Sequence, residues 1–361
     1  MSRMNLMEES RGTQVEGFCM VKSCAVRTDS KGASYMDMTV ADAGGECAAK
    51  LWNYNIAAYG TFDPEDVVKI RATINIWKDV EQLKVERIRL ATPEDNVDMS
   101  RLVPCAPGDP QKYFDYLWNL SDEFTDKDLK KLVQYFLDAF RQEILRFPAG
   151  VKLHHATRGG WLQHTCAVVR MGRAICQLYP ALDRDLVTAG ATLHDIGKLY
   201  ELQTGKLGLA TAYTPEGQLL GHINIGISLI HNAADRLDIP EETAMLLEHM
   251  LLSHHGQPEF GSPKFPMFPE AEVLSECDLL DSRLFEMFDA LSAVNTGEFT
   301  DRQWALDNRR LYRHGHNFSK ESGGFQSGAG TADGQPAAAA EDDSLAAKLS
   351  SLAGKFNSMK S

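Results

Sequence analysis

An imidazole and a carboxylate stand side by side at His194 and Asp195, in the run Ala-Thr-Leu-His-Asp-Ile-Gly-Lys. Further residues that can bind a metal ion follow at intervals of 30, 28, 32 and 24 residues, in the series His164, His194, His222, His254 and Asp278. Each interval is about one helix and one connection long, so successive helices can each bring one ligand to a shared centre. The spacing therefore predicts a metal site inside a helical bundle.

Imidazole and carboxylate ligands together suit zinc, manganese, iron and similar ions, and the scattered cysteines argue against a thiolate site. Four histidines and two aspartates exceed what one tetrahedral ion needs, so we expect two divalent ions bridged by Asp195. Two ions about 3.5–4 Å apart clamp a phosphoryl group, one activating water and the other neutralising charge on the leaving oxygen. Lys198, four residues after His194, is expected one turn along the same helix, where its ammonium can hold a phosphate oxygen.

Glycines flank three of these positions, at Gly159–Gly160, Gly221 and Gly256, and glycine allows a backbone to approach an ion or ligand closely. A single helical histidine is usually an ordinary core or surface residue, but the combination predicts ligands. Asp281 would share a helical face with Asp278 and is an alternative for the last ligand. The predicted ligand set is His164, His194, Asp195, His222, His254 and Asp278, with His255 as an alternate.

These residues resemble the H…HD…H…H…D signature of the HD-domain metal-dependent phosphohydrolase superfamily. The surrounding sequence is similar to one branch, the YhaM-type 3′→5′ exoribonucleases, over roughly residues 14–310. The motifs that carry the resemblance are His154-His155-Ala-x-x-Gly-Gly-Trp-Leu-x-His164-Thr, Leu-His194-Asp195-Ile-Gly-Lys-x-x-Glu-Leu, Gly221-His222-Ile and Leu-Ser-His254-His255-Gly-x-x-Glu-Phe-Gly-Ser-Pro.

The resemblance implies an OB-fold nucleic-acid-binding domain in front of the HD domain. It also implies removal of nucleoside monophosphates from the 3′ end of single-stranded RNA, with single-stranded DNA as a second substrate. Mn²⁺ is the metal that it favours, and the ligand chemistry leaves Fe, Co, Ni and Zn open. By the same resemblance His154, His155 and Arg158 are expected on the substrate side, in the turn before the first ligand.

Residues 14–95 read as a β domain. Five short runs alternate between apolar and polar residues, and segments with turn chemistry separate them, such as Asp29-Ser-Lys-Gly32 and Asp42-Ala-Gly-Gly45. A break at 53–62 separates the third run from the fourth. This pattern fits a five-stranded OB-like barrel, whose second and third strands bind oligonucleotides.

Aromatic and basic residues in this β domain are candidate nucleic-acid contacts, because aromatic rings stack on any base and cations follow the backbone. Many such aromatics belong to the core of a small barrel, and ten Lys/Arg against eleven Asp/Glu over 14–92 leave the region slightly acidic. The candidates are Arg27, Lys31, Tyr35, Lys50, Trp52 and Trp77.

After a proline-rich linker at 96–112, residues 113–312 are expected to form an all-α HD domain. Within it, 203–220 is predicted to be a loop or short hairpin, and the proline-rich stretch 256–269 is predicted to form a rim in which Glu259 and Ser262 line the entrance. The expected helices lie at about 113–119, 125–147, 160–178, 183–202, 221–237, 240–254 and 269–293.

The two ends differ from these domains. Residues 1–13 read as an extension and 313–361 as a mostly disordered tail, rich in Gly, Ala, Ser and acids, with an amphipathic helix at 344–357. That helix is either a docking peptide for a partner or a frayed end. A homo-oligomer is compatible with the sequence, although no surface demands one.

The whole chain sets outer bounds on function. It has 361 residues, a net charge of −13, and no apolar run near the ~20 residues of a membrane span, so no membrane partner is expected. The first residues become charged too early for a signal peptide. Seven scattered cysteines indicate reduced thiols in a cytoplasm.

Two other functions remain compatible with these residues. One is an HD-type phosphohydrolase of nucleotides or cyclic dinucleotides, in which the barrel has a regulatory role. The other is a nucleic-acid-binding adaptor whose HD domain is inactive. The complete ligand set and Lys198 argue against the adaptor, because a domain that loses its activity in evolution usually loses metal-binding residues first.

Overall fold

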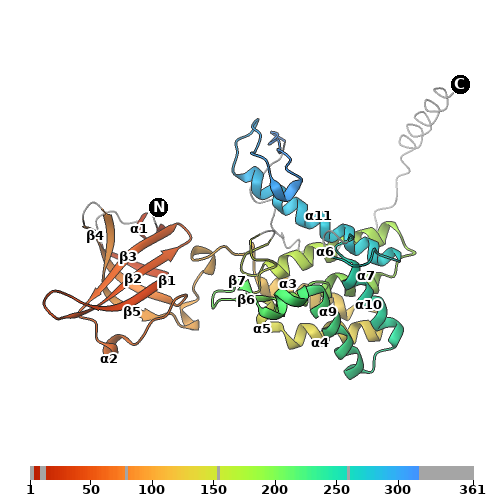
Figure 1. Ribbon diagram of the computed structural model, residues 1–361, viewed down its shortest axis with the longest axis horizontal. Coiled ribbons are helices and arrows are strands. Elements are labelled where there is room, and N and C mark those ends of the chain that lie inside the picture. The colour runs from red at the N-terminus through yellow and green to blue at the C-terminus, as the bar shows by residue number, and fades with distance from the viewer. Residues whose placement is uncertain (1–3, 9–13, 78–79, 153–154, 258–260, 317–361) are drawn as a thin grey trace, which may run out of the picture. The chain divides into compact units, whose positions relative to one another are not determined.

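The computed structural model describes residues 4–8, 14–77, 80–152, 155–257 and 261–316. Its N-terminal part is a closed five-stranded barrel (Figure 1). The strand order around the barrel is β1-β2-β3-β5-β4, antiparallel except for the β3–β5 pair. The strands are β1 Gln14–Thr28, β2 Ser34–Asp42, β3 Gly45–Trp52, β4 Val67–Trp77 and β5 Val80–Leu90, and a short helix α2, Ile56–Tyr59, lies between β3 and β4.

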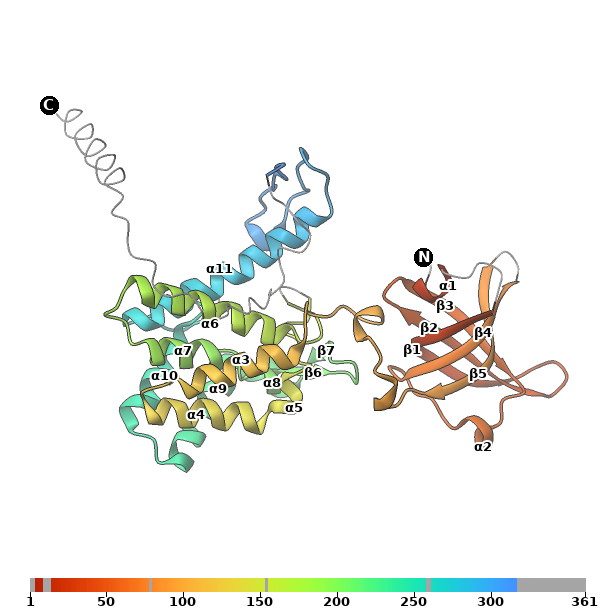
Figure 2. The ribbon, with the colours of Figure 1, turned by 180° about the vertical axis from the view of Figure 1, so that it is seen from behind.

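The barrel forms because its strands alternate in polarity, so that every second side chain enters the core. In β4, for example, Val68, Ile70 and Ala72 are buried while their neighbours point outward. The predicted OB-like barrel is thus confirmed, and Figure 2 shows the same strands from behind. The strands run further than the sequence pattern indicates, because the two ends of β1 extend its pairing with β2 and β4.

Part of the N-terminal extension packs into the barrel. Helix α1, Asn5–Glu8, places Met4 and Met7 among the buried core residues of the barrel. Asp42 holds this turn, because its carboxylate accepts hydrogen bonds from the backbone N–H groups of Asn5 (3.0 Å) and Leu6 (2.9 Å).

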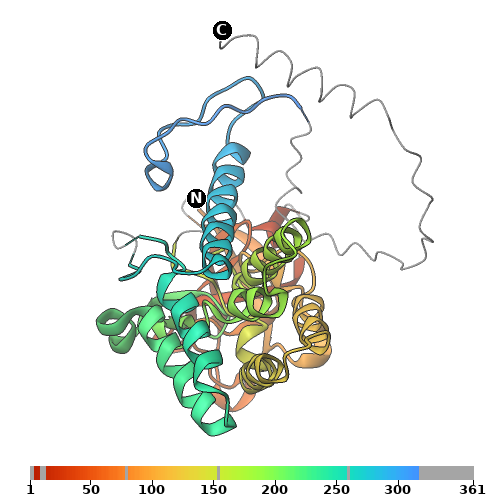
Figure 3. The same cartoon turned by 90° about the vertical axis from the view of Figure 1, so that its right-hand side faces the viewer.

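The C-terminal part is a helical domain, in which α6 packs against α7 and α11, and α9 against α10 (Figure 3). Trp161, Phe136, Leu247 and Met250 lie in its buried core. The helices are α3 Pro110–Asp122, α4 Lys127–Ala139, α5 Arg141–Ile144, α6 Gly160–Leu178, α7 Arg184–Leu193, α8 Lys198–Glu201, α9 Pro215–Leu237, α10 Glu241–Ser253 and α11 Pro269–Ser292. No described helix is long and apolar enough to cross a membrane.

Two expected helices are divided, and one is preceded by a further helical segment. The helix expected at 125–147 is divided at Phe140. The helix expected at 221–237 is present, but α9 also includes a segment from Pro215, which joins it across a kink at Gly221 and follows the predicted hairpin of β6, Leu202–Thr204, and β7, Ala210–Tyr213. The helix expected at 183–202 ends at Leu193 and resumes at Lys198, because the intervening turn is closed by tighter i→i−3 hydrogen bonds.

Glycines explain two of these local departures. A Cβ on Gly197 would lie 2.0 Å from the carbonyl oxygen of His222, so glycine is needed where this turn meets α9. Gly221 has φ 71° and ψ 157°, which puts a kink into α9 just before His222. Both departures lie beside the histidine-rich centre that the sequence predicts.

After α11 the chain continues to His316 in irregular structure with a short 3₁₀ turn, Trp304–Leu306, and isolated bridges such as Phe299 to Tyr312. The tail beyond residue 316 and its expected helix at 344–357 lie outside the described residues.

Candidate metal centre

Five helical segments bring the predicted ligands together. His164 lies in α6, His194 ends α7, His254 ends α10, and His222 follows the kink of α9. Asp195 lies in the turn after α7 and Asp278 lies in α11. The side chains of these six residues are at most 14% exposed. The six residues that the spacing predicts as ligands thus lie together, on five helical segments, inside the bundle.

One half of the centre surrounds His164. Its Nε2 atom is 3.1 Å from Asp278 Oδ1, 3.2 Å from His194 Nε2 and 3.6 Å from Asp195 Oδ2. The Asp195 Oδ2 atom is also 3.4 Å from His194 Nε2. Two imidazole nitrogens and two carboxylate oxygens therefore face one point.

The other half uses the second oxygen of the same carboxylate. Asp195 Oδ1 is 3.6 Å from His222 Nε2 and 4.0 Å from His254 Nε2. The ring of His255 lies 4.3 Å from that of His254 and 5.1 Å from that of His222. Nitrogen atoms of these three histidines lie within 4.8 Å of one another. Asp195 thus lies between two groups of ligand atoms, as a bridging carboxylate would.

The outer ring nitrogens orient the four imidazoles. The Nδ1 atoms of His194 and His254 are bonded to the backbone oxygens of Ala191 (2.9 Å) and Leu251 (2.7 Å), which can only accept. Those of His164 and His222 are bonded to carboxylate oxygens of Asp281 and Glu201. In a neutral ring with the proton on Nδ1, the Nε2 atom presents a lone pair toward the centre, which is the tautomer that a metal ligand needs.

Burial and neighbouring charges set the protonation of this centre. Burial, together with the nearby rings of His255 and His194, holds the pKa of His254 well below its ordinary value, so its imidazole stays neutral. Burial alone would lower the pKa of His164, but the Asp278 and Asp281 carboxylates outweigh it and raise that pKa to about 10. These carboxylates therefore give the pocket a strong preference for positive charge.

Lys198 lies beside the bridging carboxylate. Its ammonium is 2.8 Å from Asp195 Oδ2. Burial would lower the pKa of Lys198, yet the charge of Asp195 raises it, so the lysine stays cationic. The expected contact of Lys198 with a phosphate stays a prediction.

The donor set fits two divalent ions. Among the described residues, the buried Nε2 atoms of His222 and His254 have no hydrogen-bond partner, which is costly for polar atoms unless they bind something. Neutral imidazoles combined with ionised carboxylates are ligands for first-row transition ions. The residues that would hold one ion are His164, His194, Asp195 and Asp278, and those for the other are Asp195, His222, His254 and His255.

Asp278 and Asp281 take different positions around His164. Asp278 faces the inner nitrogen, whereas Asp281 Oδ2 lies 2.7 Å from the outer Nδ1 and 2.9 Å from His155 Nε2. Asp281 is therefore placed to orient the His164 ring, and Asp278 is placed to be a metal ligand. His155 is buried behind His164 and packs on Phe285.

Two of the remaining substrate-side and entrance candidates have contacts that the structure describes. Arg158 donates to the backbone oxygen of Leu207 (2.9 Å), and its own backbone pairs with Pro104 and Ala106 of the linker. The hydroxyl of Ser262, which the sequence placed at the entrance, accepts a hydrogen bond from the backbone N–H of His255 (3.0 Å). His154 and Glu259 lie outside the described residues.

On the barrel, four of the six candidate nucleic-acid contacts lie on β1, β2 and β3. Tyr35 and Trp52 are cross-strand neighbours with stacked rings 4.7 Å apart, and the ammonium of Lys50 lies 5.5 Å from the Tyr35 ring. Trp52 is 41% exposed, so one face of this stack meets solvent. Arg27 pairs with Asp37, Lys31 lies in the β1–β2 turn, and Trp77 ends β4.

Two residues that support the centre were not predicted from the sequence. Glu201 Oε1 accepts from both the backbone N–H (3.0 Å) and Nδ1 (3.2 Å) of His222. The indole of Trp161 donates to the backbone oxygen of Asp195 (3.0 Å). Glu201 follows His194 by seven residues, two helical turns, but the break between α7 and α8 makes that spacing uninformative.

We expect Asp281→Asn to weaken Mn²⁺ binding about 10–100-fold, because a carboxylate that orients a ligand imidazole raises its basicity. The dependence of activity on Mn²⁺ concentration measures this, and saturating Mn²⁺ should recover most of the rate. Asp289→Asn, an exposed position on the same helix, is the matched control. An unchanged Mn²⁺ dependence would exclude the orienting role.

Comparisons with known proteins identify relatives of this chain. A family model described as HD domain matches residues 161–283. The 3′-5′ exoribonuclease YhaM of Oceanobacillus iheyensis is 36% identical over 312 residues, which cover 86% of this chain and 97% of that protein. The YhaM of Bacillus subtilis is 34% identical over 308 residues, covering 85% and 97%. Among solved structures, the HD domain of L. monocytogenes phosphodiesterase PgpH matches 37% of this chain and 68% of its own, at 17% identity and a TM-score of 0.24.

Proposed function

The chain belongs to the YhaM family of 3′-5′ exoribonucleases, and from this premise we propose that it hydrolyses single-stranded RNA from the 3′ end to nucleoside monophosphates. The observation that carries the proposal is the position of Asp195, whose two oxygens face two separate groups of buried histidines. Such an arrangement suits the cleavage of a phosphodiester, in which charge develops on both the attacking and the leaving oxygen.

The side chains of the centre have distinct tasks in this reaction. The histidines, Asp195 and Asp278 would hold divalent ions, which supply Lewis acidity and lower the pKa of water when they are bound. Lys198 keeps Asp195 ionised from 2.8 Å away and offers an ammonium to a phosphate oxygen. Asp281 and Glu201 keep the rings of His164 and His222 directed inward. We propose Mn²⁺ as the working metal, since imidazole-rich sites with carboxylates accept it readily.

The barrel would bind the RNA strand outside the catalytic centre. We propose that the stacked pair of Tyr35 and Trp52 receives a base, with Lys50 beside it for the backbone. Stacking accepts any base, which suits an exonuclease that removes successive nucleotides. Single-stranded DNA would bind the same platform.

We also propose that the protein is cytoplasmic. None of the seven cysteines forms a disulfide, and five of them are buried. Burial raises the pKa of Cys19 and Cys166, which keeps these thiols protonated and unreactive. Cysteines that form no disulfide suit a reducing compartment.

The direct test uses a 5′-labelled single-stranded RNA with purified protein and Mn²⁺. A ladder that shortens from the 3′ end, with nucleoside monophosphates as product, is the expected result. An untouched RNA beside a hydrolysed free or cyclic nucleotide would reject the proposal. A 3′-labelled copy of the same RNA should release its label in the first cleavage.

Replacing Trp52 with Ala should weaken RNA binding, because each base stacked on an aromatic ring contributes about 1–3 kcal/mol. That corresponds to about a 5–150-fold higher Kd. Fluorescence anisotropy of a labelled oligonucleotide, with EDTA present to stop cleavage, measures this. Trp304→Ala is the matched control, since Trp304 is 72% exposed and lies outside the barrel. Equal affinities for wild type and both variants would remove Trp52 from the binding surface.

A further inference from the structure

A cavity of about 370 Å³ lies on the outside of the barrel, over β4, β5, the start of β1 and helix α2. The candidate contacts on β1, β2 and β3 do not line it. Its volume falls within the range of small-ligand pockets. The residues that line it are Glu16, Ala58, Tyr59, Lys69, Ile70, Arg71, Arg87, Ile88 and Arg89.

Four cations form a two-by-two grid in this cavity. The antiparallel pairing of β4 and β5 sets Lys69 opposite Arg89 and Arg71 opposite Arg87. The alternate residues Ile70 and Ile88 are buried, so the four charged side chains leave the barrel on its outer face. Like charges directly opposite each other on neighbouring strands destabilise a sheet. Two such pairs in succession therefore destabilise the sheet, and a bound anion would offset the repulsion between the cations.

Carboxylates neutralise only part of this grid. Glu16 pairs with Arg71 (2.6 Å) and Lys69 (3.3 Å), and Asp95 pairs with Arg89 (2.6 Å). Arg87 is exposed, and no ion pair or hydrogen bond of its side chain occurs within the described part of the chain. Glu86, its neighbour, bonds to Thr73 and Gln14 instead. Arg87 thus lines the cavity with a guanidinium that no described carboxylate neutralises.

An aromatic wall completes the cavity. Tyr59 of α2 lines it and stacks on Tyr54, with ring centroids 6.3 Å apart. A guanidinium fork and an aromatic face together suit a phosphate and a base, which are the two parts of a nucleotide.

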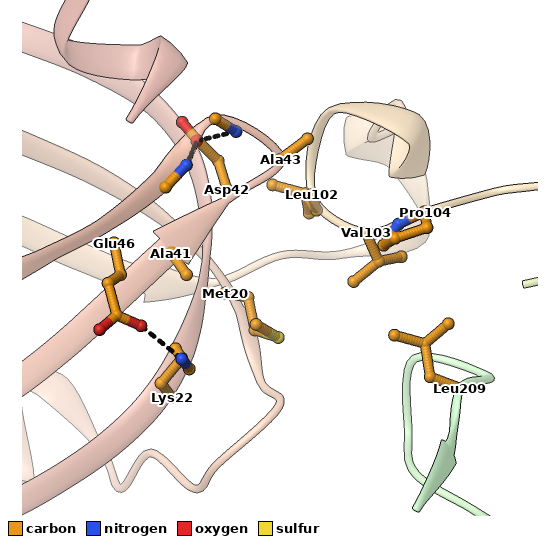
Figure 4. Close-up of a pocket in the computed structure, with 12 residues that line it drawn as sticks. Met20, Lys22, Ala41, Asp42, Ala43, Glu46, Leu102, Val103, Pro104 and Leu209 are labelled. Atoms are coloured by element: carbon orange, nitrogen blue, oxygen red, sulfur yellow. Dashed lines mark hydrogen bonds and ion pairs between the residues drawn. The ribbon is translucent and has the colours of Figure 1, made fainter. Parts of the chain in front are cut away.

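Another hollow on the barrel lacks these properties. Figure 4 shows it between the barrel and the linker, with apolar residues such as Met20, Leu102 and Val103 on its wall. Its one cation, Lys22, is paired with Glu46, and Asp42 accepts from the backbone N–H groups of Gly44 and Gly45. An anion would find no unpaired positive charge in that hollow.

We propose that the cavity over β4 and β5 binds a phosphate-bearing nucleotide unit of the RNA strand, with Arg87 on the phosphate and Tyr59 beside the base. The inference rests on the proposed exoribonuclease function, since that function supplies the strand. The free nucleoside monophosphate released by the reaction carries the same chemistry and is the other source of such a ligand.

Full-length protein in EDTA is titrated against a 5′-fluorescein-labelled 20-nucleotide RNA, and separately against adenosine 5′-monophosphate by calorimetry. Arg87→Glu is expected to weaken RNA binding about tenfold at low salt and to reduce the slope of log K against log salt by about 1. Arg87→Lys keeps the charge but loses the planar fork, so its affinity should lie between those of wild type and Arg87→Glu. Lys112→Glu, at an exposed position on α3, makes the same change in net charge and should have no effect.

Arg87→Glu turns a like-charged cross-strand pair with Arg71 into an opposite-charged one, so its melting temperature should not fall. Loss of RNA affinity alone identifies the strand as ligand, and loss of monophosphate binding alone identifies the free nucleotide. If Arg87→Glu binds both like wild type, or if Lys112→Glu loses as much affinity, the proposal is wrong. Wild-type cleavage with Mn²⁺ is assayed in parallel, so that a chain without nuclease activity is recognised separately from a cavity without a ligand.

Discussion

Asp195→Asn is expected to lower the rate of RNA cleavage by about three orders of magnitude or more, because metal ions contribute several kcal/mol to the transition state and each 1.36 kcal/mol is tenfold in rate. Among the described residues, Asp195 is the carboxylate that faces both groups of histidines. The amide keeps the shape of the side chain but removes the negative charge that both ions would share. Single-turnover cleavage of a labelled RNA measures the loss.

The same substitution leaves a buried ammonium without its partner. Lys198 is only 8% exposed and lies 2.8 Å from Asp195, and breaking such a pair costs about 3–5 kcal/mol of unfolding free energy. A double variant, Asp195→Asn with Lys198→Met, removes both charges and should regain much of that stability without regaining activity. Urea denaturation separates the two effects. A single variant that cleaves RNA at the wild-type rate would eliminate the bridging role.

Metal removal should abolish cleavage completely and lower the melting temperature. The carboxylates of Asp195 and Asp278 are buried and their pKa values are lowered, so both are ionised and face the imidazoles, where a divalent cation would bind them. An ion at a hundred times its Kd stabilises the folded state by about 2.7 kcal/mol. Protein treated with EDTA and dialysed should regain activity and melting temperature with Mn²⁺, and gain little from Mg²⁺, which prefers oxygen ligands.

A control variant makes the metal experiment specific. His254→Ala removes one imidazole from the second group, so the rise in melting temperature with Mn²⁺ should shrink. His231→Ala changes an exposed histidine of α9 and should leave that rise intact. Activity that persists in chelator would contradict metal dependence altogether.

The ligand spacing could be predicted from the sequence because each helix contributes one residue, and an interval of about 30 residues survives small errors in helix boundaries. The same holds for the barrel, where alternation along β2 and β4 follows directly from burial on one face. The choice between Asp278 and Asp281 could not be made in this way. Both lie on one face of α11, and only the orientation of the His164 ring separates the inner nitrogen from the outer one.

Features that depend on strand register or on contacts between distant segments could not be predicted from the sequence either. Arg71 lies opposite Arg87 because an irregularity between Arg71 and Ala72 shifts the β4–β5 pairing. The spacing of residues in the sequence does not predict this shift. The end of α7 at Leu193 reflects the close approach of Gly197 to His222, two segments that are distant along the chain. Glu201 gains its role only after that turn has redirected the backbone.

The N-terminal turn carries one more consequence for how RNA can travel. Met4 and Met7 belong to the buried core of the barrel, and Asp42 holds their turn through two backbone hydrogen bonds. These methionines and the inward side chains of the strands form one packed core, so the described part of the barrel is not a channel. A polynucleotide can therefore only be wrapped along its outside, and deleting the first eight residues should expose apolar surface rather than open a passage.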